Sequence, residues 1–306
     1  MSRRSRPAWV YVLLTSLLAV LLLTLWLGED SANKQAISPQ AMPPAVVFEE
    51  FGLHDNEPPQ PLAKEKMKLP IMPGKQHGIA LILDDVGYDL RALRRALDFH
   101  LPMAIAILPN APHAAKAAQL AHEAGYPVML HMPMEPANAH YRKLMDDSFI
   151  RIGMPREKVR QMMAEALAKV PYVEGVNNHM GSGLTALEEP MRWVMEVCRE
   201  RNLFFIDSRT NKDTVAAKIA SDVGLRWGER RVFLDDNVEP ELLKKSWRKT
   251  RTRLAKDGFV IVIAHPHRET LDFLQQAVTA DDRAAMVPLN SVLFPAARHG
   301  QTAGSM

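Results

Sequence analysis

Residues 79–85 read Ile-Ala-Leu-Ile-Leu-Asp-Asp, an apolar run that ends in two carboxylates. Four later apolar runs also end in residues able to bind a metal ion or transfer a proton. They are residues 128–130 before His131, 173–176 before Asn177-Asn178-His179, 203–206 before Asp207, and 260–264 before His265. A parallel barrel gathers its active site from the carboxyl ends of several strands. The pattern therefore favours an enzyme.

Longer amphipathic segments separate these runs, which predicts helices that alternate with strands of a parallel sheet. Seven strands are expected, at residues 79–83, 103–108, 128–131, 173–176, 203–206, 231–234 and 260–264. No G-x-G-x-x-G sequence follows the first of them, so a flat dinucleotide-binding sheet is not favoured. We predict an α/β fold, a distorted (β/α) barrel of about seven parallel strands over residues 76–295.

The composition limits the classes of partner. The formal net charge is +3 in 306 residues, and Arg3, Arg4 and Arg6 alone match it. The rest of the chain is near neutral, which argues against a nucleic-acid partner. The single cysteine, Cys198, cannot form an internal disulfide and is expected to be a small buried hydrophobe.

The N-terminal region predicts a membrane anchor. Residues 9–27 carry no charge, arginines precede them and acids follow. This pattern predicts a cytoplasmic segment at 1–7, one inner-membrane helix at 8–27 and a periplasmic catalytic domain. Removal of a secretory signal peptide, with release to the periplasm, is the alternative. Residues 28–75 are expected to be a flexible Pro-rich linker and 296–306 a flexible tail.

Asp84 and Asp85 are placed at the mouth of the predicted barrel. If the strand continues through them, their side chains point in opposite directions. One carboxylate can then bind a metal ion while the other acts as a general base. The alternative is that both are helix-capping acids in a loop.

Two histidines are further candidate metal ligands. His131 belongs to His131-Met132-Pro133-Met134-Glu135, in which Pro133 opposes a regular helix and predicts a tight loop. Glu135 can be a ligand, a partner of the histidine or a loop anchor. His179 precedes a glycine-rich turn and is the third candidate ligand, with a plain turn as the alternative.

The remaining candidates are polar residues after other strands. Asn177 and Asn178 offer amides for substrate binding, whereas Asp207 and Arg209 can bind substrate or form a buried ion pair. His265 is the candidate general acid. The acidic pair Asp235-Asp236 is assigned to a loop or cap.

Together these motifs resemble the polysaccharide deacetylases, specifically the divergent polysaccharide deacetylases. The resemblance spans residues 78–295. It is carried by ALILDDVG at 80–87, HMPMEP at 131–136, NNHMGS at 177–182, FFIDSRT at 204–210 and AHPH at 264–267.

This resemblance implies a distorted barrel that removes N- or O-acetyl groups from sugar polymers with a divalent metal ion, often zinc. It implies that Asp84 is the catalytic base, Asp85 a metal ligand, His131 the first histidine of the metal motif and His265 the acid. Glu135 stands where ordinary members have a second histidine, so His179 is the candidate replacement. The usual arginine-proline motif is also missing.

The sequence thus predicts a membrane-anchored periplasmic hydrolase acting on a cell-envelope polysaccharide or a peptidoglycan-type glycan. A catalytically inactive barrel, serving as a carbohydrate-binding or envelope scaffold protein, is the alternative. Metal-dependent phosphoester hydrolysis is less favoured, because no cluster of lysines and arginines accompanies the acids in the sequence.

Overall fold

The computed structural model describes residues 77–296, and the predicted anchor at 8–27, the linker and nearly all of the tail lie outside this range. In the described part, eight strands form one sheet in the order β6-β5-β4-β3-β2-β1-β8-β7, and all seven pairings are parallel. The strands are β1 (Gly78–Val86), β2 (Met103–Ile107), β3 (Val128–Met134), β4 (Val173–Met180), β5 (Phe204–Asp207), β6 (Trp227–Glu229), β7 (Val232–Phe233) and β8 (Phe259–Ala264).

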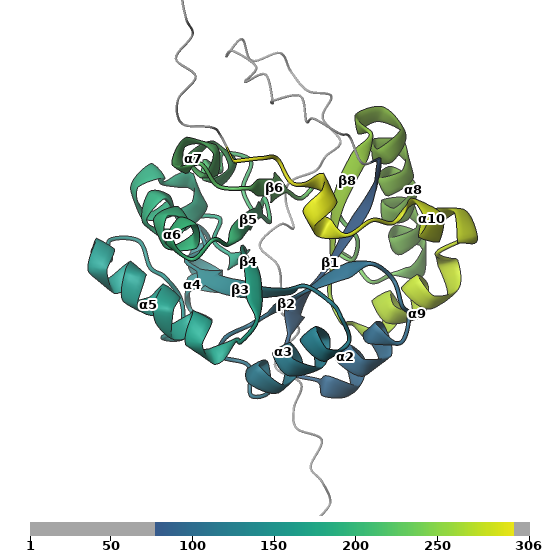
Figure 1. The fold of residues 1–306 in the computed structure, drawn as a ribbon, viewed down its shortest axis with the longest axis horizontal. Coiled ribbons are helices and arrows are strands. Elements are labelled where there is room, and N and C mark those ends of the chain that lie inside the picture. The colour runs from purple at the N-terminus through teal and green to yellow at the C-terminus, as the bar shows by residue number, and fades with distance from the viewer. Residues whose placement is uncertain (1–76, 297–306) are drawn as a thin grey trace, which may run out of the picture. The chain divides into compact units, whose positions relative to one another are not determined.

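Helices surround the outside of the curled sheet (Figure 1). The α-helices are α2 (Leu90–Leu97), α3 (Ala114–Glu123), α4 (Ala139–Arg142), α5 (Arg156–Lys169), α6 (Glu188–Glu200), α7 (Ala216–Val223), α8 (Pro240–Asp257), α9 (Arg268–Ala277) and α10 (Ala280–Ala285). Two 3-10 helices, η1 (Leu184–Ala186) and η2 (Leu289–Val292), complete the set in this range. The predicted distorted (β/α) barrel is confirmed as a curled parallel half-barrel.

Alternate residues of each central strand face two different cores. In β1, Leu81 and Leu83 pack in the larger cluster with the helices, whereas Ala80 and Ile82 pack in a smaller inner cluster. The inner cluster also contains alanines of β2 and residues of η2, because small side chains fit the narrow interior of a curled sheet. Both faces are buried, which explains the continuous apolar runs of the sequence.

The strand expected at 231–234 is observed as β7, and the edge strand β6 accounts for the difference from the seven expected strands. β6 has three residues, including Gly228, and β7 has two, so neither carries a strong apolar signal. Between them, the Arg230 N–H donates to the Asp207 carbonyl at 2.9 Å and the Arg231 N–H to the Ile261 carbonyl at 2.9 Å. This short link crosses the opening of the half-barrel.

Strands β3 and β4 are longer than expected and run through the candidate site. His131 pairs with Asn177, and Pro133 with His179. The predicted tight loop at Pro133 is therefore wrong. Proline is tolerated because the pairing with β2 ends at Leu130, so no ladder partner on that side needs the missing N–H. Residues two apart on a strand share a face, which places the polar side chains of both strands together.

Over residues 77–296, none of the helices combines the length and the apolar character needed to cross a bilayer.

The close packing of β4 on β5 gives a first prediction. A Cβ added at Gly175 would overlap the ring of Phe204, which is fully buried. Gly175→Ala is expected to lower the free energy of unfolding by about 2 to 3 kcal/mol, because overpacking forces the ring from its place. Adding Phe204→Leu should recover part of that loss, which a double-mutant cycle measured by chemical denaturation would show. Simple additivity of the two substitutions would contradict this explanation.

A second stability prediction concerns Asp282, which joins α10 to α8. Its carboxylate accepts hydrogen bonds from the Trp247 Nε1 at 3.1 Å, from two Arg251 nitrogens at 2.8 and 2.6 Å, and from the Thr279 N–H at 2.9 Å. Burial opposes ionisation, but Arg251 and these donors lower the pKa of Asp282. Asp282→Asn is expected to lower the free energy of unfolding by about 2 kcal/mol at neutral pH.

The sign of the pH dependence follows from the lowered pKa of Asp282. The stabilisation is present above the unfolded pKa of about 3.9 and is lost as the pH falls through the folded value. The difference between the wild-type and Asp282→Asn proteins should therefore shrink below about pH 4 in chemical denaturation. The exposed neighbour Asp281 provides the control, Asp281→Asn. A difference that stays constant with pH would be inconsistent with this role.

Candidate metal and hydrolytic site

Three side chains from different strands converge at the carboxyl ends of the sheet. Asp85 comes from β1, His131 from β3 and His179 from β4. Asp85 Oδ1 lies 3.2 Å from His131 Nε2 and 3.0 Å from His179 Nδ1, and the two imidazole nitrogens are 3.2 Å apart. The predicted ligands Asp85, His131 and His179 therefore form one group able to hold a metal ion.

The donor set of this group fits a divalent cation. Asp85 Oδ1 is buried and makes no hydrogen bond to the described residues, a costly state for a carboxylate oxygen. Ligands of a tetrahedral ion at 2.0 to 2.1 Å lie about 3.4 Å apart, close to the separations in this group. One oxygen and two imidazole nitrogens are also a ligand set typical of zinc and other transition metals.

The backbone of β1 brings both carboxylates to the same site. Asp85 has a φ of 54°, a left-handed conformation, and the pairing of β1 with β2 shifts register between Leu83 and Val86. Asp84 Oδ2 consequently lies 3.7 Å from His131 Nε2, on the same side as Asp85. The expectation of opposite directions assumed a regular strand, and this irregularity overturns it.

Asn177 positions His131 for metal binding. The Asn177 Nδ2 donates to both oxygens of Asp84, at 3.0 and 2.9 Å, so its Oδ1 faces His131 Nδ1 at 2.9 Å. An amide oxygen only accepts, which places the imidazole proton on Nδ1 and leaves the lone pair of Nε2 for an ion. Asn177 is fully buried. It acts as a positioning residue for His131 and Asp84.

The two adjacent carboxylates have different electrostatics. Burial raises the pKa of Asp84, an effect only partly offset by His131 and His265. Burial acts on Asp85 as well, but His179 and His131 outweigh it and lower the pKa of Asp85 well below its usual range. Neighbouring groups whose pKa values are pushed apart are suited to separate roles. Asp85 remains an anion for a cation to bind, whereas Asp84 is better able to take up a proton.

His265 extends from the end of β8 and is oriented by Asp235. Asp235 Oδ1 lies 3.0 Å from His265 Nδ1, while its Oδ2 accepts the His265 backbone N–H at 2.7 Å and the Thr270 hydroxyl at 2.7 Å. His265 Nε2 is 4.0 Å from Asp85 Oδ2. Burial opposes protonation, but Asp235 raises the pKa of His265 to about 9. This geometry suits a proton donor directed at the site.

Sequence reasoning missed the role of Asp235. Asp235 lies in the loop after β7, as predicted, but its carboxylate is buried and hydrogen-bonded to His265, which the sequence does not indicate. The two-residue strand β7 carries too little apolar signal to mark Asp235, two residues after it, as a strand-end residue. Asp235, His265 and His267 also lie close enough to form a second ligand group. Three donors already occupy the Asp235 carboxylate, so the Asp85 group is the better metal site.

The remaining predicted site residues serve the loops. Glu135 Oε2 accepts the Ile152 N–H at 2.8 Å, and Glu135 is not part of the ligand group. Of the three roles left open for Glu135, the structure shows the loop anchor. The buried Asn178 donates to the Met180 carbonyl at 2.7 Å and accepts the Ser208 N–H at 2.9 Å. These contacts tie the end of β4 to the loop after β5.

Asp207 and Arg209 do not form the ion pair that was one of their expected roles. The Asp207 carboxylate accepts the Arg209 backbone N–H at 2.8 Å and the Thr214 hydroxyl at 3.0 Å. Burial raises the pKa of Asp207 despite these bonds. The Arg209 guanidinium instead donates to Glu229 at 2.8 Å. Asp207 is thus a structural group of the loop after β5.

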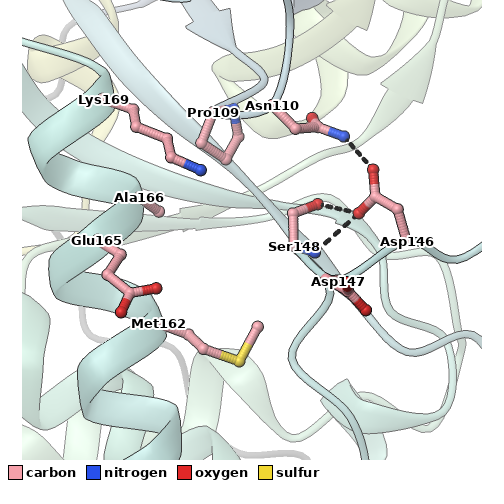
Figure 2. A pocket seen from close by; sticks show the side chains of 9 residues that line it. All are labelled: Pro109, Asn110, Asp146, Asp147, Ser148, Met162, Glu165, Ala166 and Lys169. Atoms are coloured by element: carbon pink, nitrogen blue, oxygen red, sulfur yellow. Dashed lines mark hydrogen bonds between the residues drawn. The ribbon is translucent and has the colours of Figure 1, made fainter.

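A hollow of about 430 Å³ lies between α5 and the loop at 146–148 (Figure 2). Figure 2 shows Lys169 and Glu165 of α5 across from Asp146, which is hydrogen-bonded to Ser148 and Asn110. None of the described residues that line it belongs to the metal-ligand group. Its mixed charges indicate no particular ligand.

Comparison with known proteins identifies the family. The family model described as divergent polysaccharide deacetylase matches residues 81–293. The uncharacterized protein YibQ of Escherichia coli K12 is 32% identical over 209 residues, which span 68% of this chain and 64% of YibQ, less than two thirds of its length. An uncharacterized protein of Haemophilus influenzae KW20 is 36% identical over 202 residues, 65% of this chain and 70% of that protein.

A solved structure shares the fold. It is an uncharacterized protein of Agrobacterium tumefaciens C58, with a TM-score of 0.64 and 17% identity, covering 71% of this chain and 88% of that one. The similarity at this identity concerns the fold alone. The match of the family model over most of the described barrel shows that the chain belongs to the divergent polysaccharide deacetylase family.

Proposed function

We propose that this protein is a metal-dependent hydrolase that removes acetyl groups from a carbohydrate of the cell envelope. The observation that carries the proposal is the convergence of Asp85, His131 and His179, with Asp84 and His265 beside them. Membership of the deacetylase family supports the reaction class. Asp85, His131 and His179 would hold the ion. When bound, a divalent ion such as Zn²⁺ supplies Lewis-acid chemistry at an acyl oxygen.

The protein's own groups account for the proton transfers. Asp84 accepts a proton from the water that attacks the acyl carbon, and Asn177 holds its carboxylate in place through two hydrogen bonds. His265 donates a proton to the departing nitrogen or oxygen as the acyl bond breaks and acetate leaves. Asp235 keeps the His265 ring oriented with Nε2 toward the site. Acid and base thus both lie beside the proposed ligand group, as an acyl hydrolysis requires.

The test is acetate release from envelope glycans by the full-length, metal-loaded protein in detergent. Asp84→Asn is expected to keep the metal and lower kcat by about 100-fold or more, because a positioned base contributes about 10² to 10⁴. Arg199→Gln, on the outside of α6, is the control. Absence of acetate release by the wild-type protein from the whole set of acetylated envelope glycans would refute the proposal and favour the scaffold alternative.

We also propose that the protein is anchored in the inner membrane, with the barrel in the periplasm. The support is the uncharged run at 9–27 and the arginines before it. Membrane fractionation with protease treatment of spheroplasts should leave the barrel in the membrane fraction and accessible from outside. Full recovery of a shortened chain in the soluble periplasmic fraction would indicate signal cleavage instead.

A further inference from the structure

A strongly basic hollow lies at the ends of β5, β6 and β7, beside α8. It has a volume of about 370 Å³. Its six basic lining residues, which define what we call the basic pocket, are Arg209, Lys212, Arg230, Arg231, Lys249 and Arg253. Among the described residues that line it, only Asp236 is acidic.

This pocket could not be recognised in the sequence, because its basic residues are spread over residues 209–253. The turn after β5, the link between β6 and β7, and α8 each contribute two of them. On α8, Ser246, Lys249 and Arg253 are three and four residues apart and so share one helix face. The sequence places no cluster of lysines and arginines beside the candidate catalytic acids, whereas the fold assembles a basic cluster from three separate segments.

Internal ion pairs leave the pocket with an excess of positive charge. Glu229 pairs with Arg209 at 2.8 Å and with Arg231 at 2.7 Å, and Arg253 has Asp257 at 3.6 Å. Of the charged residues lining the pocket in the described part of the chain, six are basic and one, Asp236, is acidic, while Glu229 and Asp257 beside it reduce this excess. An oxyanion in this hollow would meet a positive potential, reduced but not cancelled by those acids.

Arg230 is held rigidly in the wall of the basic pocket. Its Nε donates to the Ser208 carbonyl at 2.6 Å and its Nη2 to the Arg209 carbonyl at 2.7 Å. Its guanidinium carbon lies 5.0 Å from the ring centroid of Phe233. A guanidinium fixed in this way loses little side-chain entropy when an anion binds.

The basic pocket shares residues with the wall of the hydrolytic site. The Phe233 ring, which lines the pocket, lies 5.0 Å from the ring of His265 between centroids. Ser208, whose carbonyl binds Arg230, also accepts the Asn177 Nδ2 at 3.3 Å through its hydroxyl. A group in the pocket would therefore sit next to a substrate whose acetyl group is at Asp84 and His265.

We propose that the basic pocket binds an oxyanion, a phosphate or a carboxylate, carried by the same glycan that presents the acetyl group. This inference rests on the proposed function and adds to it that the substrate is an anionic sugar. Lysine and arginine form charge-assisted hydrogen bonds to both kinds of oxyanion. The volume suits one such group with part of its sugar ring.

The test compares three sugars by calorimetry on the full-length protein in detergent at low salt. They are neutral N-acetylglucosamine, N-acetylglucosamine 1-phosphate and the carboxylate N-acetylmuramic acid, and inorganic phosphate is measured beside them. At least one anionic sugar should bind about 10-fold more tightly than the neutral sugar. This difference in affinity between the anionic and the neutral sugar should decrease as the salt concentration is raised, because exposed charges are screened. Comparison of the phosphate and carboxylate sugars identifies the oxyanion.

The double variant Lys249→Gln/Arg253→Gln should reduce this advantage by about 5-fold or more, since it removes two of the six cations. Lys245→Gln/Arg248→Gln is the matched control: it removes the same charge from exposed positions of the same helix. Equal binding of neutral and anionic sugars would overturn the inference, as would equal losses in both double variants. Tight binding of inorganic phosphate alone would also overturn it.

These outcomes do not depend on catalysis. A protein that prefers anionic sugars but releases no acetate would contradict the proposed hydrolase and leave the pocket assignment standing. A protein that releases acetate without any preference for anionic sugars would support the proposed hydrolase and contradict the pocket assignment.

Discussion

Replacement of Asp85 by asparagine is expected to reduce affinity for a divalent metal ion by more than about 100-fold. The substitution keeps the side-chain shape but removes the anion whose Oδ1 faces His131 and His179 at 3.2 and 3.0 Å. Loss of a residue that merely orients a ligand costs about 10- to 100-fold, so loss of a charged ligand should cost more. Competition with a chelator, read by metal analysis of the protein, measures the change.

Glu135→Gln is the control for this experiment, because the sequence offered Glu135 as a ligand candidate as well. The structure uses its carboxylate to hold the Ile152 N–H, so metal affinity should stay within a few-fold of wild type. Circular dichroism establishes that both variants are folded. If Glu135→Gln lost the metal and Asp85→Asn kept it, the ligand group would be wrong and the proposed mechanism with it.

Replacement of Asp235 by asparagine should lower kcat by about 10² to 10⁴, the range associated with general acid–base groups. Asp235 raises the pKa of His265 to about 9 against the effect of burial. In the wild-type protein His265 is protonated below about pH 9 and can donate its proton over the neutral range. Without the anion, its pKa should fall toward the reference value of about 6.5 or below.

The pH dependence separates this role from a purely structural one. The alkaline limb of the kcat/KM profile should move to lower pH in Asp235→Asn, since the acid loses its proton earlier. Thr270→Val removes the hydroxyl that donates to Asp235 Oδ2 at 2.7 Å, and should shift the limb in the same direction by less. Asp213→Asn, at an exposed loop position, is the control. A lower rate with an unmoved profile would contradict proton donation by His265.

Part of the site could be predicted because its chemistry follows strand ends. Asp84, Asp85, His131, His179 and His265 each stand directly after an apolar run or close to its end, and the carboxyl ends of parallel strands meet at one edge. The structure brings all five together. The sequence does not establish His131 and Glu135 as a pair of metal ligands, because residues four positions apart lie close together in a helix but not in a strand.

The roles of the other polar residues depended on partners far away in the sequence. Asn177 hydrogen-bonds to Asp84, which is 93 residues away in the sequence, and Asp235 contacts His265, which is 30 residues away. Such pairs depend on sheet order and register, which local composition does not encode. The same holds for the basic pocket, whose arginines and lysines are assembled from three separate segments.

The sequence by itself determined the alternation of strands and helices, the parallel sheet and the residue types at its carboxyl edge, because hydrophobic periodicity and strand length are local properties. The tertiary structure alone decided which carboxylate faces the imidazoles, which amide fixes the His131 tautomer, and which acid raises the pKa of His265. Distances of about 3 Å between side chains arise only when strands distant in sequence pair in one register, and at that scale hydrogen bonds and ion pairs acquire their strength.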